Sequence, residues 1–195
     1  MIMVIFGAGA SHDSIPSCPP QRTSQDADRP PLAAELFQGR FTEWVKKFPK
    51  CIPIIPYLRS IAPGKTLEQE LESLREEGKT DAERLRQLAA IRFYLQSVIW
   101  HCEYRWEDFA QGITNYVTLL DQLRRVRAKN EPVLLVTFNY DRMIESSLSS
   151  VNLSISEFQH YIQNDAFRLF KLHGSVNWVR EVENQVINIS EFNDW

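Results

Sequence analysis

The sequence is poor in the features that define metal-bound, disulfide-linked or membrane-spanning proteins. Its only cysteines are Cys18, Cys51 and Cys102, and without a Cys-x-x-Cys pair neither a common zinc site nor a disulfide framework is expected. No apolar run approaches the length of a membrane span, and the N-terminus lacks the basic leader of a signal peptide. We therefore expect a cytoplasmic protein that binds neither zinc nor a membrane.

An excess of one charge is also missing. The 22 basic and 25 acidic side chains give a net charge of −3, which offers no electrostatic reason to expect direct nucleic-acid binding. The hydrophobic fraction of 44% is ordinary for a globular chain with a real core. A length of 195 residues suits a single domain, or one domain with an insert.

Short apolar runs predict the strands. Residues 2–6 and 132–138 are apolar throughout and end at glycine or polar turns, a pattern typical of central parallel strands. Further strands are predicted at 153–158 and 167–172, with a hairpin over 176–189. Residues from about 32 to 130 show mainly helical periodicity. This order predicts an α/β fold with a parallel sheet and a mostly helical insert.

Start signals divide the helical part into segments. Threonine followed three residues later by Gln or Glu forms a capping box, which typically opens a helix, and paired prolines favour a first helical turn. The signals are Pro30-Pro31 before 32–37, Thr66 with Gln69, Thr80 with Glu83, and a periodic stretch from Asp108. A further short helix is predicted at 143–148. The proline-rich segment 51–63 is expected to be an irregular linker.

The first polar loop, Gly7-Ala8-Gly9-Ala10-Ser11, directly follows the first strand. A Gly-x-Gly sequence in this position lets the backbone approach a phosphate, to which its N–H groups can donate hydrogen bonds. The third glycine of the usual dinucleotide fingerprint is absent, so a tight structural turn stays open as the alternative.

Two further loops carry side chains suited to chemistry. Asn139 and Asp141 follow the strand at 132–138, where ligands bind in open α/β sheets, although either residue is also a common helix cap. His173 ends the strand at 167–172 and is followed by Gly174; a histidine there can act as a base, or can be structural. Because parallel strands share a carboxyl edge, we expect the three loops to converge on one cleft.

These residues resemble the SIR2-like family. The matching segments are Gly7 to Ser11, Thr137-x-Asn139-x-Asp141 and the stretch from Lys171 to Trp178. The sequence Arg29-Pro30-Pro31-Leu32 followed by Glu35-Leu36-Phe37 is similar to the bacterial SIR2-like branch, whose members often act in antiphage defence. The resemblance spans residues from about 2 to 180 and implies that residues 1–195 form one Rossmann-like NAD-binding domain.

The resemblance also implies roles for individual residues. The glycine loop would hold the pyrophosphate and the nearby ribose, Asn139 and Asp141 would lie at the nicotinamide and its ribose, and His173 would be the catalytic histidine. The expected catalytic residues are Asn139, Asp141 and His173, and the expected NAD-binding residues are Gly7, Ala8, Gly9, Ala10, Ser11, Asn139, Asp141 and Gly174.

Members of the defence branch hydrolyse NAD to nicotinamide and ADP-ribose, and we expect the same reaction here, with NAD as the substrate. Two alternatives stay open: a non-catalytic NAD or ADP-ribose sensor or scaffold, and an NAD-dependent protein deacylase, which the missing zinc module disfavours. The chain ends soon after the histidine motif, so we expect a sheet truncated at its C-terminal side, as in the N-terminal part of a larger protein. Assembly with copies of itself, or with further domains or partner proteins, is expected to control activity.

Overall fold

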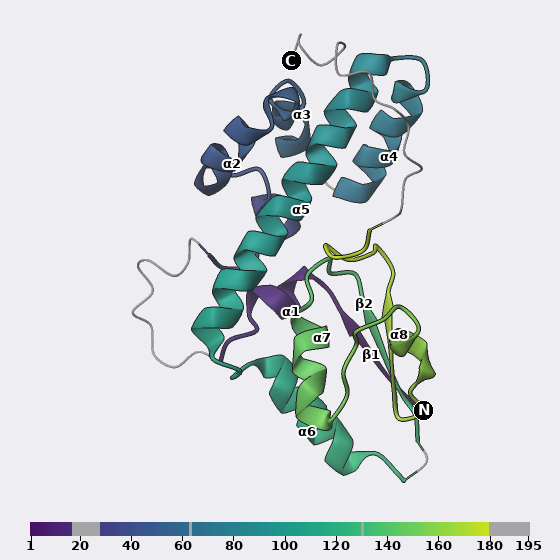
Figure 1. The fold of residues 1–195 in the computed structure, drawn as a ribbon. Coiled ribbons are helices and arrows are strands. Elements are labelled where there is room, and N and C mark those ends of the chain that lie inside the picture. Colours follow the sequence, from purple (N-terminus) through teal and green to yellow (C-terminus); the bar gives the residue numbers. More distant parts are fainter. Residues whose placement is uncertain (17–27, 63, 130, 180–195) are drawn as a thin grey trace.

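The fold is given by a computed structural model that describes residues 1–16, 28–62, 64–129 and 131–179 (Figure 1). Strands and α-helices alternate at the two ends of this range, and the middle is helical. The elements in chain order are β1 (Ile2–Phe6), α1 (Ala8–His12), the 3-10 turns η2 (Ala33–Glu35) and η3 (Gly39–Phe41), α2 (Thr42–Lys47), η4 (Pro49–Cys51), α3 (Ile55–Arg59), α4 (Leu67–Gly78), α5 (Ala82–Ala110), α6 (Asn115–Val126), β2 (Val133–Thr137), α7 (Met143–Ser147), η5 (Leu148–Val151), α8 (His160–Gln163) and β3 (Phe167–Lys171).

Three parallel strands form one sheet in the order β1-β2-β3. Its register aligns Phe6 with Thr137 and Thr137 with Lys171, so the three strands end at the same level. The loops that follow them therefore leave the sheet side by side at its carboxyl edge. The predicted α/β fold, with a Rossmann-like parallel sheet and a mostly helical insert, is confirmed.

The buried side chains form two separate cores. The first joins the inner face of the sheet to α6 and α7, and the second lies among α2, α3, α4 and α5 as far as Cys102. Helix α5 is 29 residues long and contributes to both, with Tyr94 in the second core and Trp106 in the first. Figure 1 shows α5 crossing the molecule from the helical part to the sheet. It is the element that fixes the insert relative to the sheet.

Helix α5 begins and ends at residues other than those predicted. The capping box of α4 at Thr66 and Gln69 is confirmed, but the box at Thr80 and Glu83 is wrong. Asp81 is the cap, and its carboxylate accepts hydrogen bonds from the N–H groups of Glu83 (2.9 Å) and Arg84 (3.2 Å). Asp81 is one residue nearer the helix than Thr80, so its carboxylate reaches these N–H groups and Asp81 is the N-cap.

The helix predicted from Asp108 is in fact two helices. Gln111 adopts a left-handed conformation with φ of 50° and ends α5. Thr114 then caps α6 by accepting a hydrogen bond from the N–H of Val117 at 3.2 Å. The apolar periodicity continues across this break, because Tyr116, like Trp106 of α5, packs into the sheet core. The spacing of apolar residues therefore does not predict the turn between α5 and α6.

Two predictions for proline-containing segments are wrong. Residues 32–37 contain only the 3-10 turn η2, in which the Glu35 carboxylate accepts from the Leu32 N–H at 3.0 Å and pairs with Arg40 at 3.1 Å. The expected linker at 51–63 instead contains α3, and η4 ends inside it. Pro49 and Pro56 lie in the first turns of η4 and α3, where a missing N–H has no cost.

Residues 153–158 form no strand. Leu153 and Ile155 pack against the sheet core and alternate with exposed serines, so the period-2 pattern reflects packing of an extended segment without strand pairing. The predicted hairpin at 176–189 lies largely outside the described residues, and of 176–179 only Val176 and Asn177 are in a turn, with no strand. Within the described part of the chain, none of the helices has the length and apolar character that crossing a membrane requires.

Candidate functional site

The three predicted loops meet at one cavity of about 290 Å³ beyond the carboxyl edge of the sheet. Ala8 and Ser11 come from α1, residues 138–141 from the loop after β2, and His173 from the loop after β3. Figure 1 shows α1 close to α5, which brings the insert over this edge. The insert and the segment before it supply the remaining lining residues, which are largely apolar: Pro30, Pro31, Ala33, Leu36, Leu67, Glu68, Leu95 and Ile99.

The amide of Asn139 ties the second loop to the first. Its Nδ2 donates to the carbonyl oxygen of Gly7 at 3.0 Å, to the Ser11 hydroxyl at 2.8 Å and to the Tyr116 hydroxyl at 3.4 Å. The Gly7 carbonyl can only accept, and this fixes which end of the amide faces inward. The Oδ1 of Asn139 accepts no hydrogen bond from the described residues, so it is available to a ligand.

Tyr116 was not predicted as part of the site. It lies on α6, is almost fully buried, and its hydroxyl is 2.9 Å from that of Ser11. Burial raises the pKa of Tyr116, so the phenol stays neutral and can both donate and accept. A tyrosine at a core position of an amphipathic helix gives no sequence signal for such a role.

Asp141 is buried at the base of the cavity, with only 6% of its surface exposed. Burial raises the pKa of this carboxyl, while hydrogen bonds from Ser11 and from the N–H of Met143, together with the charge of Lys171, act in the opposite direction. Oδ1 accepts from the Met143 N–H at 3.1 Å, in the manner of a helix cap for α7. Asp141 therefore makes the helix-cap contact that the sequence left open as an alternative, and it also lines the cavity.

A buried ion pair supports this loop from below. Lys171, at the end of β3, donates to the backbone carbonyl of Asp141 and, at 2.8 Å, to the carboxylate of Glu145 on α7. The Glu145 carboxylate also accepts from the Tyr161 hydroxyl at 3.0 Å. Lys171 therefore links β3 to the loop after β2, and its role in the motif is to hold Asp141 in place.

A second buried carboxylate holds the same loop from the insert. Glu103 of α5 is 1% exposed and accepts from the backbone N–H and the Nε of Arg142, both at 2.8 Å. Burial raises the pKa of Glu103 to about 7, against the opposing effect of the Arg142 hydrogen bonds. The loop that carries Asn139 and Asp141 is thus fixed by charged residues on two sides. Glu103 was not predicted, because no local motif surrounds it.

His173 lies at the mouth of the cavity and is exposed. Its ring centroid is 5.3 Å from that of Phe138 and 6.0 Å from that of Tyr140. The imidazole forms no hydrogen bond within the described residues, so both ring nitrogens remain available to a ligand or to water. His12, beside the glycine loop, is engaged elsewhere: its Nδ1 is 2.9 Å from the Pro30 carbonyl oxygen.

The remaining predicted residues are divided between the loop and a second cavity. Gly7 and Gly9 are exposed next to the cavity and Ala10 packs on the sheet core, and none of the three lines the cavity itself. Gly174 lines a neighbouring cavity of about 510 Å³. This second cavity shares Tyr140, His173 and part of the insert wall with the first. Together the two cavities form an extended site with His173 between them.

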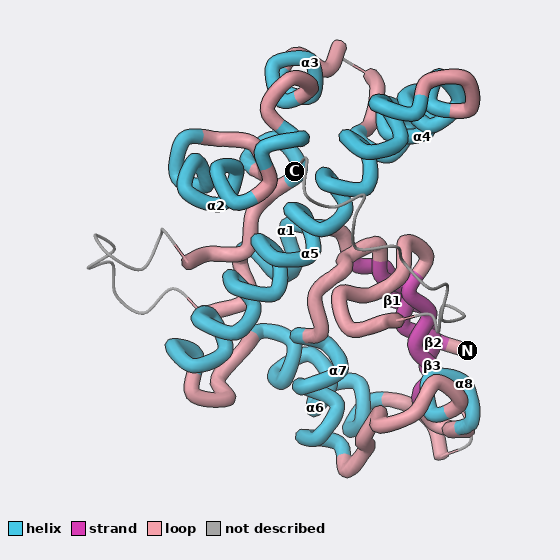
Figure 2. Tube along the Cα trace, turned by 45° about the horizontal axis from the view of Figure 1, so that its top comes forward, coloured by secondary structure: helices cyan, strands magenta, loops and turns pink. Residues whose placement is uncertain are grey.

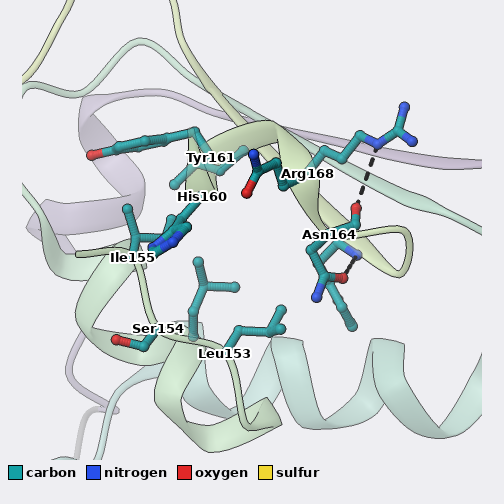
Figure 3. Close-up of a pocket in the computed structure, with 11 residues that line it drawn as sticks. Leu153, Ser154, Ile155, His160, Tyr161, Asn164 and Arg168 are labelled. Atoms are coloured by element: carbon teal, nitrogen blue, oxygen red, sulfur yellow. Dashed lines mark hydrogen bonds between the residues drawn. The ribbon is translucent and has the colours of Figure 1, made fainter. Parts of the chain in front are cut away.

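A third cavity, of about 210 Å³, lies away from the predicted residues, among η5, α8 and β3 (Figure 3). Two of its polar side chains have partners: Arg168 Nε donates to the Asn164 carbonyl at 3.4 Å, and His160 Nδ1 is 3.2 Å from the hydroxyl of Ser156, which lies outside the cavity. No group of three His, Cys, Asp or Glu residues in the described part of the chain is arranged to hold a metal ion.

Comparisons of the chain with protein-family models, with curated proteins and with solved structures gave no match.

Proposed function

We propose that this chain hydrolyses NAD at the nicotinamide–ribose bond, releasing nicotinamide and ADP-ribose. The observation that carries the proposal is the convergence of Ser11, Asn139, Asp141 and His173 on one cavity, from three loops far apart in the sequence. The resemblance of those loops to the SIR2-like family supports NAD as the substrate. Its bacterial branch supports antiphage defence as the setting.

The composition of the cavity suits one end of a dinucleotide. Apolar and aromatic side chains form most of its lining, and the polar groups concentrate at Ser11, Asn139 and Asp141, which is the usual make-up of a small-molecule site. Asn139 Oδ1 is suited to accept from a carboxamide N–H or a ribose hydroxyl. The adjoining cavity gives an extended ligand room to continue past His173.

The proposed reaction breaks the bond between the ribose C1′ and the nicotinamide nitrogen. The bonding electron pair leaves with nicotinamide, and the ribose carbon acquires positive charge before a water oxygen bonds to it. Ionised Asp141 stabilises that charge, and His173 accepts the proton that water loses. Because burial raises the pKa of Asp141, the rate is expected to rise with pH over a range above that of an ordinary aspartate.

Turnover by two single variants of the full chain tests this mechanism. Asn139→Ala and His173→Ala should each lower the rate of nicotinamide release by about 10²–10⁴-fold, the usual effect of removing a positioned polar or acid–base group. His160→Ala is the matched control, since His160 lines the separate third cavity. Unchanged rates in both site variants would exclude the mechanism.

A second candidate is an NAD or ADP-ribose sensor that does not turn over its ligand. The exposure of His173, and the lack of a described hydrogen bond that would orient it as a base, favour this alternative. Calorimetry with NAD, combined with an assay for free nicotinamide, separates the two candidates. Binding without nicotinamide release identifies a sensor.

A further inference from the structure

A row of hydroxyl groups leads from the sheet core to Asp141. Tyr116 of α6 is 3% exposed, and its hydroxyl oxygen lies 2.9 Å from that of Ser11 on α1. Ser11 in turn forms a hydrogen bond with the carboxyl group of Asp141. Helix α6 lies beside α7, the helix that Asp141 caps (Figure 2). Tyr116 lines neither cavity of the extended site, so its effect on a ligand must pass through the residues that it contacts.

The surrounding groups determine the direction of the hydrogen bond between Tyr116 and Ser11. Among the described residues, the Tyr116 hydroxyl also meets the Nδ2 of Asn139, at 3.4 Å. An amide nitrogen donates and cannot accept, so the Ser11 oxygen is the acceptor within reach of the phenol proton. A buried hydroxyl proton without an acceptor would destabilise the fold. Tyr116 is therefore the donor and Ser11 the acceptor.

This direction leaves the Ser11 hydroxyl with one orientation. Its two lone pairs accept from Tyr116 at 2.9 Å and from Asn139 Nδ2 at 2.8 Å. Its own proton then points away from both partners, and the carboxylate of Asp141 accepts it. If Ser11 instead donated to Tyr116, the phenol proton would have no acceptor among the described residues, and Asp141 would lose a donor.

We propose that Tyr116 is a positioning residue, whose hydroxyl donates to Ser11 and thereby directs the Ser11 proton onto the carboxylate of Asp141. A hydroxyl that accepts a hydrogen bond becomes a stronger donor, so the arrangement favours the ionised form of Asp141. In the proposed reaction this form stabilises the positive charge on the ribose. That consequence rests on the proposed function, whereas the hydrogen-bond arrangement does not.

Other charged and titratable groups surround Asp141. They are Lys171 at the end of β3, Glu145 of α7, Glu103 of α5, the neighbouring Arg142, and His173 across the cavity. Within the described part of the chain, none of these groups forms a hydrogen bond with Ser11 or Tyr116. Removing the Tyr116 hydroxyl therefore leaves their own hydrogen bonds in place.

Titration of the Asp141 carboxyl in the free, full chain tests the proposal without a ligand. Carbon-13 NMR of side-chain carboxyl groups gives the pKa, and the signal that is missing from Asp141→Asn identifies the residue. Ser11→Ala should raise the pKa of Asp141 by about one pH unit or more, because the carboxylate loses a hydrogen bond. Tyr116→Phe should raise it by about half a pH unit, because the remaining donor is weaker. The phenylalanine ring keeps the packing on Phe6, at 5.4 Å between ring centroids.

The double variant Ser11→Ala with Tyr116→Phe distinguishes positioning from a structural role. If Tyr116 acts through Ser11, the double variant should have the same Asp141 pKa as Ser11→Ala alone. Additive shifts would show that Tyr116 acts on Asp141 by another route, and no shift in Tyr116→Phe would show that Ser11 is a donor without it. Either result would overturn the proposal.

Tyr94→Phe is the matched control. Tyr94 is also fully buried, and its hydroxyl donates to the backbone carbonyl of Leu36 in the insert. Its loss should lower the melting temperature to a similar extent as Tyr116→Phe and leave the pKa of Asp141 unchanged. An equal pKa shift in Tyr94→Phe would show that the change reflects general loosening of the fold, and would overturn the proposal.

Turnover measurements separate this proposal from the proposed function. If the wild-type chain releases nicotinamide, the pH midpoint of kcat should be higher in Tyr116→Phe by the same shift as the Asp141 pKa, with the KM for NAD nearly unchanged. An unmoved midpoint would overturn the catalytic part of the proposal. A wild-type chain that releases no nicotinamide would exclude the proposed function, while the NMR titration would still decide whether Tyr116 orients Ser11.

Discussion

Glycine occurs at three positions of the site for different physical reasons. Gly174 has φ of +88°, a left-handed conformation that side chains rarely adopt. Gly7 and Gly9 have no such conformation, and a Cβ at either position would meet nothing within 4 Å. The backbone and packing of the protein therefore do not require these two glycines. Under the proposed function, close approach of the NAD pyrophosphate would explain their lack of a side chain.

Gly9→Ala should separate stability from binding. Gly9 lies within α1, where alanine is favoured over glycine by up to about 1 kcal/mol, so the melting temperature should rise or stay constant. If a phosphate approaches this backbone, the added methyl group should weaken NAD binding by about tenfold or more, a loss of at least about 1.4 kcal/mol. Thermal denaturation and calorimetry measure the two effects. Gly174→Ala, the comparison variant, should instead lose about 1–2 kcal/mol of stability. Unchanged affinity in Gly9→Ala would contradict a phosphate at this loop.

Glu103 makes stability depend on pH. Burial raises its pKa from 4.5 to about 7, so between these values the folded chain binds a proton that the unfolded chain has released. The stabilisation from this group is fully present below pH 4.5 and is lost as pH rises through 7. The shift corresponds to about 3 kcal/mol at 1.36 kcal/mol per pH unit.

Glu103→Gln should remove this pH dependence. Glutamine is neutral at every pH and similar in shape, so the free energy of unfolding of the variant should vary less than that of the wild type between pH 4.5 and 7. Urea denaturation at several pH values gives the measurement. Parallel pH profiles for variant and wild type would show that Glu103 remains ionised throughout, held by Arg142. At neutral pH the variant also leaves the Arg142 guanidinium without its charged partner, which should lower stability.

At the scale of the element, Thr80 and Asp81 are the two neighbouring candidates for the residue that caps α5. Asp81→Ala should cost about 1 kcal/mol, because it removes the acceptor for the N–H groups of Glu83 and Arg84. Thr80→Ala should cost only a few tenths of a kcal/mol, since its exposed hydroxyl bonds only to the Glu77 carbonyl oxygen of the preceding helix at 3.3 Å. Chemical denaturation of both variants measures the difference. A larger loss in Thr80→Ala would restore the predicted capping box.

The same elements show which local signals could be read from the sequence. Strands β1, β2 and β3 were predicted because each is a short apolar run that ends at a polar turn, and this signal needs no tertiary information. The segment at 153–158 carries an alternating pattern too, but a strand requires a partner, and partners are set by the whole fold. The helical spacing of apolar residues continues from the end of α5 into α6, so it does not predict the break at the left-handed residue Gln111.

The residues of the candidate site also differ in whether a local sequence signal predicts them. Asn139, Asp141 and His173 follow strands, and strand order alone brings their loops together at the carboxyl edge. Tyr116 and Glu103 come from helices whose contact with the site depends on how α5 and α6 pack against the sheet. No local motif encodes that packing. The sequence therefore predicts which loops converge, and only the fold identifies the side chains that hold them.

At the scale of the molecule, the cavity lies between two cores that share one helix. Its floor belongs to the sheet core, and its roof comes from α4, α5 and the segment before η2. Trp106 near the end of α5 is anchored in the sheet core, while the helix from Leu88 to Cys102 packs in the insert core. Because the two cores are separate, we expect the roof to lose its packing more readily than the floor.

Hydrogen exchange should reveal these two units. Ile91 is fully buried in the insert core, so Ile91→Ala creates a cavity that should cost about 2–5 kcal/mol. Because the insert core is separate, the loss of amide protection should concentrate in α3, α4 and the first half of α5, with β1, β2 and β3 nearly unchanged. Leu135→Ala, at an equally buried residue of the sheet core, should produce the reverse pattern. If either variant lowers protection equally in both regions, α5 couples the two cores into one cooperative unit, and the roof and floor of the cavity unfold together.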